Sequence, residues 1–257
     1  MSGVYADLQD RAAVVTGASS GIGLGIAKAL LEQGMRVAVH YNRNQDAAGS
    51  LCAEHPGRAF AVQADLGTEE GCVRLAREAV RVLGGAQVLV HSAGIWNDGP
   101  IATLSRPALE EIFRINTFSA FSLVRELLPS LRARGGSVVF IGSTAGQRGE
   151  PGHSHYAASK GAVHSLALSL AVELAPAVRV NVVSPGWIRT PMAEGALRQI
   201  GEVVAATLPN RRLGEIEDVV NAVLFLASDA SSHVLGQDLG VSGGALLVVP
   251  RGQFAPR

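Results

Sequence analysis

The sequence predicts an α/β fold of the doubly wound type, in which helices cover both faces of a parallel sheet. Short apolar runs alternate with longer segments of helical pattern along the chain. The short runs are continuously apolar, as in strands that are buried on both faces. Because crossovers between parallel strands are right-handed, we expect helices on both sides of the sheet. No linker, charge block or internal repeat interrupts the pattern, so one domain over residues 1–257 is expected.

Each expected element has a local reason in the residue pattern. The strands are short runs rich in valine and other apolar residues. They lie at 12–16, 36–40, 59–63, 87–91, 137–142, 178–184 and within 237–244. The helices are longer and lie between them, at 21–33, in the polar stretch before 59, at 68–83, within 105–134, at 156–175 and at 217–228. The first helix ends at Gly34, which is a typical stop.

The segment 186–214 resembles a core element least. It contains Pro191, Pro209 and several glycines. A connection of this length usually forms a lid or a binding segment, so we expect it to cover the substrate.

Composition and charge narrow the class of protein. Hydrophobic residues make up 47% of the chain and charged residues 17%, which allows a large buried core. The 22 basic and 22 acidic residues give a net charge of +0, so neither nucleic acid nor a membrane is expected as a partner. Cys52 and Cys72 have no spacing typical of disulfides or metal ligands, and no metal is expected. Without a signal-like or spanning apolar stretch, we expect a cytoplasmic protein.

The stretch TGASSGIG (16–23) joins the first strand to the first helix. Gly17, Gly21 and Gly23 allow a sharp turn and close approach of a ligand to the backbone. The free N–H groups of the helix N-terminus favour a pyrophosphate. The G-x-x-x-G-x-G spacing differs from the strict dinucleotide fingerprint, and a tight strand–helix connection is the alternative interpretation.

The end of the second strand bears on the choice of cofactor. It reads His40-Tyr41-Asn42-Arg43, without the carboxylate that usually binds the ribose hydroxyls of NAD. The Arg43 guanidinium suits a 2′-phosphate, so NADP(H) is favoured and NAD(H) stays possible. A solvated loop charge is the other interpretation of Arg43.

YAASK (156–160) is a candidate for acid–base chemistry, and a chance occurrence of the Tyr-x-x-x-Lys spacing is the alternative interpretation. Tyr156 and Lys160 are four residues apart in a helical pattern, so they share one helix face. An adjacent ammonium is expected to lower the pKa of a phenol toward neutrality. Ser143 follows a strand and is expected to hydrogen-bond a substrate carbonyl, while Asn116 is a candidate to hold water near Lys160.

Together these features resemble the short-chain dehydrogenase/reductase family, and its bacterial 3-oxoacyl-carrier-protein reductase and glucose dehydrogenase branches in particular. The resemblance runs in the family's order over about 16–244. It rests on TGASSGIG, Asp65-Leu66, HSAG (91–94), Asn116, Ser143, Tyr156-Ala157-Ala158-Ser159-Lys160 and Pro185-Gly186-Trp187-Ile188-Arg189-Thr190.

The resemblance implies a seven-stranded parallel Rossmann sheet in the order 3-2-1-4-5-6-7, and usually a homotetramer. It implies hydride transfer that interconverts a ketone or aldehyde and an alcohol. In this scheme the proton donor is Tyr156, Lys160 holds ribose hydroxyls, Ser143 polarises the carbonyl and Asn116 supports the proton relay. The implied cofactor-binding residues are Gly17, Ser19, Ser20, Gly21, Ile22, Gly23, Tyr41, Asn42, Arg43, Asp65, Leu66, Ser92, Ala93, Gly94, Tyr156, Lys160, Pro185, Gly186, Ile188 and Thr190.

The sequence departs from the family's pattern at the end of the fourth expected strand. The family commonly reads Asn-Asn-Ala-Gly where this chain has His91-Ser92-Ala93-Gly94. Ser92 lacks the reach of an amide, so we expect a folded, active enzyme with altered cofactor affinity or stability. We expect His91 to be packed or hydrogen-bonded rather than catalytic.

Several interpretations stay open from the sequence. Trp96, Trp187 and Met192 are candidates for an apolar substrate pocket, for ordinary core packing or for a subunit contact. His153 and His155 favour loop polarity over a metal site. The alternatives to an NADP(H)-dependent reductase are an NAD-dependent sugar, polyol or steroid-type dehydrogenase and a non-catalytic nucleotide-binding regulator or assembly subunit.

Overall fold

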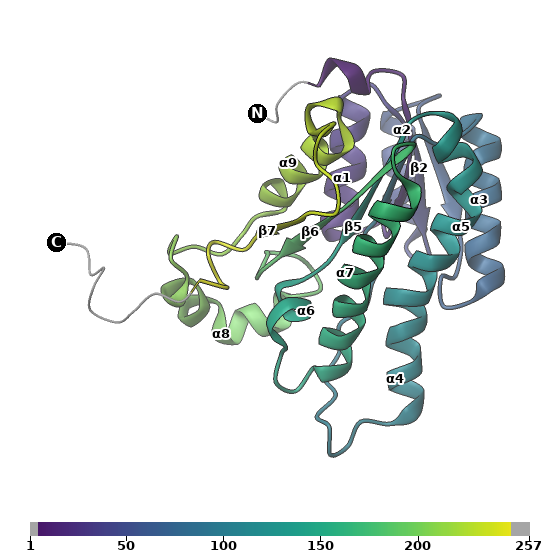
Figure 1. Cartoon of the computed structure of the whole chain (residues 1–257). Helices are drawn as coiled ribbons and strands as arrows, with labels where there is room; N and C mark the ends of the chain where they lie inside the picture. The colour runs from purple at the N-terminus through teal and green to yellow at the C-terminus, as the bar shows by residue number, and fades with distance from the viewer. Residues whose placement is uncertain (1–4, 248–257) are drawn as a thin grey trace.

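The computed structural model describes residues 5–247 and contains one seven-stranded parallel sheet (Figure 1). The strand order is β3-β2-β1-β4-β5-β6-β7, which confirms the expected sheet. The strands are β1 (Ala12–Thr16), β2 (Arg36–Tyr41), β3 (Ala59–Gln63), β4 (Val88–His91), β5 (Gly136–Ile141), β6 (Val178–Pro185) and β7 (Asp238–Val241).

The helices cover both faces of this sheet. They are α1 (Gly21–Glu32), α2 (Gln45–Glu54), α3 (Glu69–Leu83), α4 (Arg106–Phe113), α5 (Ser119–Ala133), α6 (Thr144–Arg148), α7 (Ser154–Leu174), α8 (Glu194–Thr207) and α9 (Ile216–Ala227). Figure 1 shows α1 and α9 on one side, and α3, α5 and α7 on the other. Two buried apolar clusters, one on each side, correspond to this arrangement.

The central strands and the covering helices form for reasons visible in the sequence. Every residue of β1 and β5 is buried, which explains their continuous apolar runs. The helix α3 begins after Thr68, whose side chain accepts a hydrogen bond from Gly71 N, and ends at Gly84 in the left-handed conformation. Its buried residues lie on one face and pack toward the sheet.

Two segments differ from the simplest expectation. The segment 105–134 is not one regular helix, because a π-helical turn at Arg114–Phe118 separates α4 from α5. The segment 186–214 is not an irregular loop, because it contains α8. Gly201 is the one buried residue of α8, and Figure 1 shows this helix away from the sheet. Sequence periodicity also missed the five-residue helix α6.

No helix among residues 5–247 has both the length and the apolar character needed to cross a membrane.

Candidate active site

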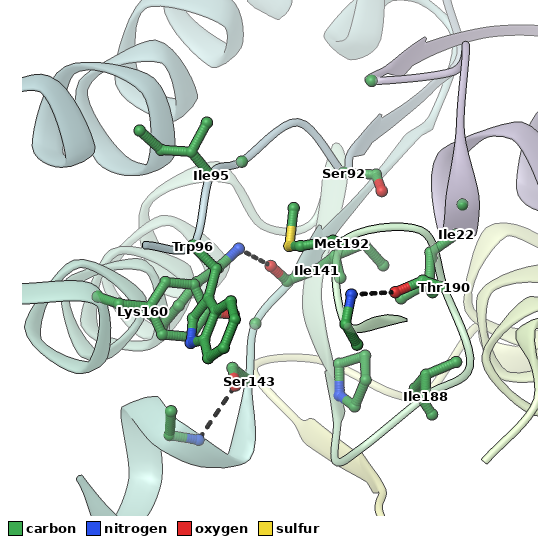
Figure 2. Close-up of a pocket in the computed structure, with 18 of the residues that line it drawn as sticks. Ile22, Ser92, Ile95, Trp96, Ile141, Ser143, Lys160, Ile188, Thr190 and Met192 are labelled. Atoms are coloured by element: carbon green, nitrogen blue, oxygen red, sulfur yellow. Dashed lines mark hydrogen bonds between the residues drawn. The ribbon is translucent and has the colours of Figure 1, made fainter. Parts of the chain in front are cut away.

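A cleft opens at the carboxyl ends of the central strands, as expected for a doubly wound sheet. Figure 2 shows side chains from the segments after β4, β5 and β6 meeting around it. Many of the residues expected to bind cofactor or substrate line this cleft. They are Gly17, Ser20, Gly21, Ile22, Gly23, Ser92, Ala93, Gly94, Ser143, Tyr156, Lys160, Pro185, Gly186, Ile188 and Thr190.

The glycine-rich turn (residues 16–23) has the geometry that a dinucleotide requires. Gly17 has φ +64°, and a Cβ there would lie 3.0 Å from Ala93 Cα. A Cβ on Gly23 would lie 2.7 Å from the carbonyl carbon of Gly17. Ser20 is the N-cap residue of the twelve-residue helix α1, but its side chain makes no capping hydrogen bond. The N–H groups in the first turn of α1 therefore have no partner from that side chain. Close backbone packing and these N–H groups fit a bound pyrophosphate.

Two buried histidines, His40 and His91, form hydrogen bonds with the glycine-rich turn. His40, at the end of β2, accepts a hydrogen bond from Gly17 N at 3.0 Å and donates to Ala64 O at 3.1 Å. His40 thus links the turn to the segment after β3. Neither contact was expected from the sequence, because the partners are more than twenty positions from His40.

His91 has the corresponding position at the end of β4. Thr16 Oγ1 accepts hydrogen bonds from Ser92 N and Ala93 N, and it donates to His91 Nδ1 at 2.9 Å. His91 Nε2 donates to Ser119 Oγ at 3.1 Å, which itself donates to Ile115 O. The fourth strand is therefore braced through His91 and Thr16 rather than through the side chain of Ser92. This agrees with the expectation of a hydrogen-bonded His91.

Burial keeps both histidines uncharged at neutral pH. It lowers the pKa of His40 to about 4 and that of His91 to about 3, from an ordinary value of 6.5. The charge of Lys160 lowers the pKa of His91 further, whereas Asp65 raises that of His40. An unfolded chain binds protons on these rings below about pH 6.5 while the folded chain does not. Stability is therefore complete above that pH and falls as the pH drops toward 4.

We expect His91→Asn to weaken this acid sensitivity. Each buried histidine contributes a loss of up to about 1.4 kcal/mol per pH unit between about pH 6 and 4. Removing one of them should make the free energy of unfolding fall less steeply with acid, whatever its value at pH 7. Urea unfolding at pH 7, 6 and 5 measures the slope, with the exposed His233→Asn as control. Parallel slopes for His91→Asn and the wild type would contradict the assignment.

Ser143, Tyr156 and Lys160 meet in the cleft as the sequence predicted. Ser143 follows β5 and begins α6, where its Oγ accepts a hydrogen bond from Ala145 N at 3.1 Å (Figure 2). Tyr156 is half-buried, and Lys160 lies one turn later on α7. Lys160 Nζ donates to Ile141 O at 2.8 Å and lies 6.0 Å from the centre of the Tyr156 ring. This contact fixes the ammonium while leaving its other protons available.

The pKa of Tyr156 differs from the sequence-based expectation. Burial raises it to about 12, hydrogen bonding from Ser143 acts in the opposite direction, and the charge of Glu150 raises it further. The expected lowering of this pKa by Lys160 is therefore wrong for this structure, because burial dominates. Burial also lowers the pKa of Lys160 itself, to about 8. At neutral pH the phenol keeps its proton, and Lys160 is mainly charged.

Asn116 lies in the π-helical turn, behind the wall of the cleft rather than in it. Its Oδ1 accepts from Ile95 N at 2.8 Å, and its Nδ2 donates to Ile95 O and to Ser159 Oγ, both at 3.0 Å. A Cβ on Gly94 would lie 3.2 Å from Asn116 Oδ1 and 3.5 Å from Lys160 Nζ. Asn116 thus ties the segment after β4 to α7. Its part in a proton relay stays a prediction.

The remaining expected cofactor residues lie outside the lining of this cleft. They are Ser19, Tyr41, Asn42, Arg43, Asp65 and Leu66. Asp65 is exposed, and its Oδ1 accepts a hydrogen bond from Gly67 N at 2.9 Å. Arg43 is also exposed, and the adjacent Asn44 donates to Ser19 O at 3.2 Å. That bond places the segment after β2 beside the glycine-rich turn, where adenosine contacts are expected.

Trp96, Trp187 and Met192 all line the cleft. That they form a substrate pocket stays a prediction. The two indole rings meet edge to face, with centroids 6.2 Å apart and planes at 82°. The His153 ring stacks on Trp96, with ring centroids 4.4 Å apart. Among residues 5–247, no group of three or more His, Cys, Asp or Glu residues is placed to hold a metal.

Sequence reasoning missed Glu150, which also lines the cleft. Its Oε2 accepts a hydrogen bond from Trp96 Nε1 at 3.3 Å. The sequence did offer one indication that Glu150 lies near the site. It stands six residues before Tyr156, in the connection that begins at Ser143.

This fold and this cleft define a dinucleotide-dependent oxidoreductase. A family model described as Enoyl-(Acyl carrier protein) reductase matches residues 17–245. The chain therefore belongs to the short-chain dehydrogenase/reductase family and is an NAD(P)-dependent enzyme, so a purely regulatory role is set aside.

Curated relatives and a solved structure agree with this assignment. The chain is 33% identical over 240 residues to the 3-oxoacyl-[acyl-carrier-protein] reductase FabG of Staphylococcus epidermidis, covering 91% of this chain and 98% of that protein. It is 36% identical over 244 residues to Nodulation protein G of Rhizobium sp., covering 94% and 99%. A glucose/ribitol dehydrogenase structure from Brucella melitensis superposes with a TM-score of 0.91 and 32% identity, covering 96% of this chain and 100% of that one.

Proposed function

We propose that this enzyme interconverts a ketone or aldehyde and the corresponding alcohol with NADP(H), and that Tyr156 donates or accepts the proton. The observation that carries the proposal is the meeting of Ser143, Tyr156 and Lys160 in one cleft with the glycine-rich turn. A nucleotide sensor would need the turn but not a half-buried phenol beside a serine hydroxyl.

In this proposed reaction, Ser143, Tyr156 and Lys160 have separate roles. The bound nicotinamide supplies or accepts the hydride. Ser143 Oγ is held at the start of α6 and donates a hydrogen bond to the substrate carbonyl. Tyr156 gives its proton to the oxygen as negative charge develops there. Lys160, fixed by the carbonyl of Ile141, offers its other N–H groups to ribose hydroxyls.

The raised pKa of Tyr156 determines its protonation state before the reaction. A phenol with a pKa of about 12 is protonated at neutral pH and ready to donate to a carbonyl oxygen. The same group serves oxidation in reverse, so assays must distinguish a reductase from the alternative of an NAD-dependent sugar, polyol or steroid-type dehydrogenase. The sugar or polyol alternative is retained because the similar structure from Brucella melitensis is named a glucose/ribitol dehydrogenase.

A direct assay tests the proposal. Purified enzyme is mixed with NADPH or NADH and a panel of ketones, aldehydes and 3-oxoacyl thioesters, and with NADP⁺ or NAD⁺ and an alcohol panel. We expect cofactor oxidation with carbonyl compounds and NADPH. Cofactor binding without turnover of any panel member would overturn the proposed activity.

Arg43 supports the choice of NADP(H). It is exposed at the end of β2, no carboxylate stands in the four residues 40–43, and its guanidinium can pair with a 2′-phosphate. We expect Arg43→Ala to raise KM for NADPH about tenfold, equivalent to roughly 1.4 kcal/mol, and to leave KM for NADH nearly unchanged. Steady-state kinetics with both cofactors measure this, with the exposed Arg77→Ala as control. Equal effects on NADPH and NADH would contradict the assignment.

We also propose a homotetramer, as the family resemblance implies, and the cytoplasmic location expected from the sequence. An exposed apolar face supports the assembly. Its residues are Phe118 and Phe121 (56% and 53% exposed) and Leu168 and Val172 on α7 (59% and 80%). Light scattering coupled to gel filtration would contradict a tetramer if it gave the mass of one chain.

A further inference from the structure

The carboxylate of Glu150 lies in the wall of the substrate side of the cleft with most of its hydrogen-bonding capacity unused. Its one side-chain partner among residues 5–247 is the indole N–H of Trp96, and no arginine, lysine or histidine of those residues forms an ion pair with it. An ionised carboxylate has about four acceptor sites. Glu150 is half-buried and its other acceptor sites are not buried, so a ligand with a donor can replace water there.

Glu150 lines the same cleft as the proposed reacting groups, Ser143 and Tyr156. Its charge raises the pKa of Tyr156, whose hydroxyl is the proposed proton donor. Because Ser143, Glu150 and Tyr156 line the same cleft, a substrate whose carbonyl oxygen lies at Ser143 and Tyr156 can reach this carboxylate.

The surroundings of Glu150 are held in place. Trp96, which donates to the carboxylate, stacks on His153 with planes at 8° and meets the edge of Trp187. His153 in turn contacts Asp98 Oδ1 through Nε2 at 3.0 Å. The wall thus presents flat apolar rings beside one fixed acceptor. Flat rings pack well against the face of a ring-shaped substrate, while the carboxylate can bind a hydroxyl at its edge.

We propose that Glu150 is a specificity-determining residue that selects carbonyl substrates with a hydroxyl group on a compact ring, over thioesters and ketones without a donor. The inference rests on the proposed function and names its substrate class. An uncharged hydroxyl fits better than a cation, because the cleft also contains the ammonium of Lys160 and, exposed in its lining, Arg148. A site that binds a substrate hydroxyl discriminates strongly against the analogue that lacks it, since its own polar group is then left unpaired.

Matched substrates test the inference. The probes are 2-, 3- and 4-hydroxycyclohexanone, cyclohexanone and a neutral acetoacetyl thioester, each reduced with NADPH. We expect kcat/KM for at least one hydroxyketone to exceed that for cyclohexanone by about ten- to a hundredfold. In Glu150→Leu, which removes the acceptor at similar size, we expect that ratio to fall below about threefold.

Two controls keep the result interpretable. NADPH titration by fluorescence shows whether the Glu150→Leu protein is folded and binds cofactor, and Glu150→Gln, with a weaker neutral acceptor, should give an intermediate ratio. The exposed Glu54→Gln on α2 makes a matched change of charge away from the cleft and should keep the wild-type ratio. Equal efficiencies with and without the hydroxyl, or a ratio unchanged in Glu150→Leu, would overturn the inference alone. Failure of the wild type to reduce any carbonyl compound would overturn the proposed function and the inference with it.

Discussion

Tyr156→Phe is expected to lower kcat for carbonyl reduction about a thousandfold while changing the dissociation constant for NADPH by less than about threefold. The substitution removes one oxygen and its proton from the cleft and leaves the aromatic ring, which lies beside Ser143 and above Lys160. Without a donor, negative charge on the substrate oxygen is stabilised by Ser143 alone, which accounts for the loss in kcat.

Steady-state kinetics and fluorescence titration separate these two effects. Tyr5→Phe is a matched control, because Tyr5 is half-buried, packs against the apolar cluster that includes α1 and α9, and does not line the cleft. We expect its kcat to equal that of the wild type. Turnover by Tyr156→Phe at the wild-type rate would show that the proton comes from another group, and the proposed mechanism would fail.

Gly23→Ala is expected to abolish measurable NADPH binding and to destabilise the fold. An added Cβ would lie against the carbonyl of Gly17, 2.7 Å from its carbon, and both atoms of that carbonyl belong to the backbone. Because the backbone has no flexible side chain to move aside, either the glycine-rich turn or the start of α1 must shift. A shift of either displaces the N–H groups that are proposed to bind the pyrophosphate, so we expect affinity to fall more than a hundredfold.

A second glycine serves as the matched control. Gly49 lies inside α2, and a Cβ there would meet nothing within 4 Å. We expect Gly49→Ala to keep the wild-type affinity for NADPH and to gain about 0.5–1 kcal/mol of stability, because alanine is the better helix former. Fluorescence titration and urea unfolding measure both variants. If Gly23→Ala bound NADPH as tightly as Gly49→Ala, the role of the turn would be refuted.

Properties that depend on neighbours in the chain were predictable from the sequence. Continuous apolar runs such as 12–16 correspond to buried strands, and the spacing of Tyr156 and Lys160 placed both on one side of α7. Ser143 was placed correctly because the carboxyl ends of parallel strands meet at one edge of the sheet. The strand order came from the family resemblance, and the structure confirms it.

Properties that depend on distant neighbours were decided by the tertiary structure alone. The pKa of Tyr156 rises because burial outweighs the hydrogen bond from Ser143, and burial is set by the packing of segments far apart in the chain. His91 reaches Thr16 and Ser119 across 75 and 28 positions, and Glu150 meets Trp96 across 54. No periodicity or motif encodes such pairs, since local patterns report which face of an element is apolar, not which side chain stands opposite it.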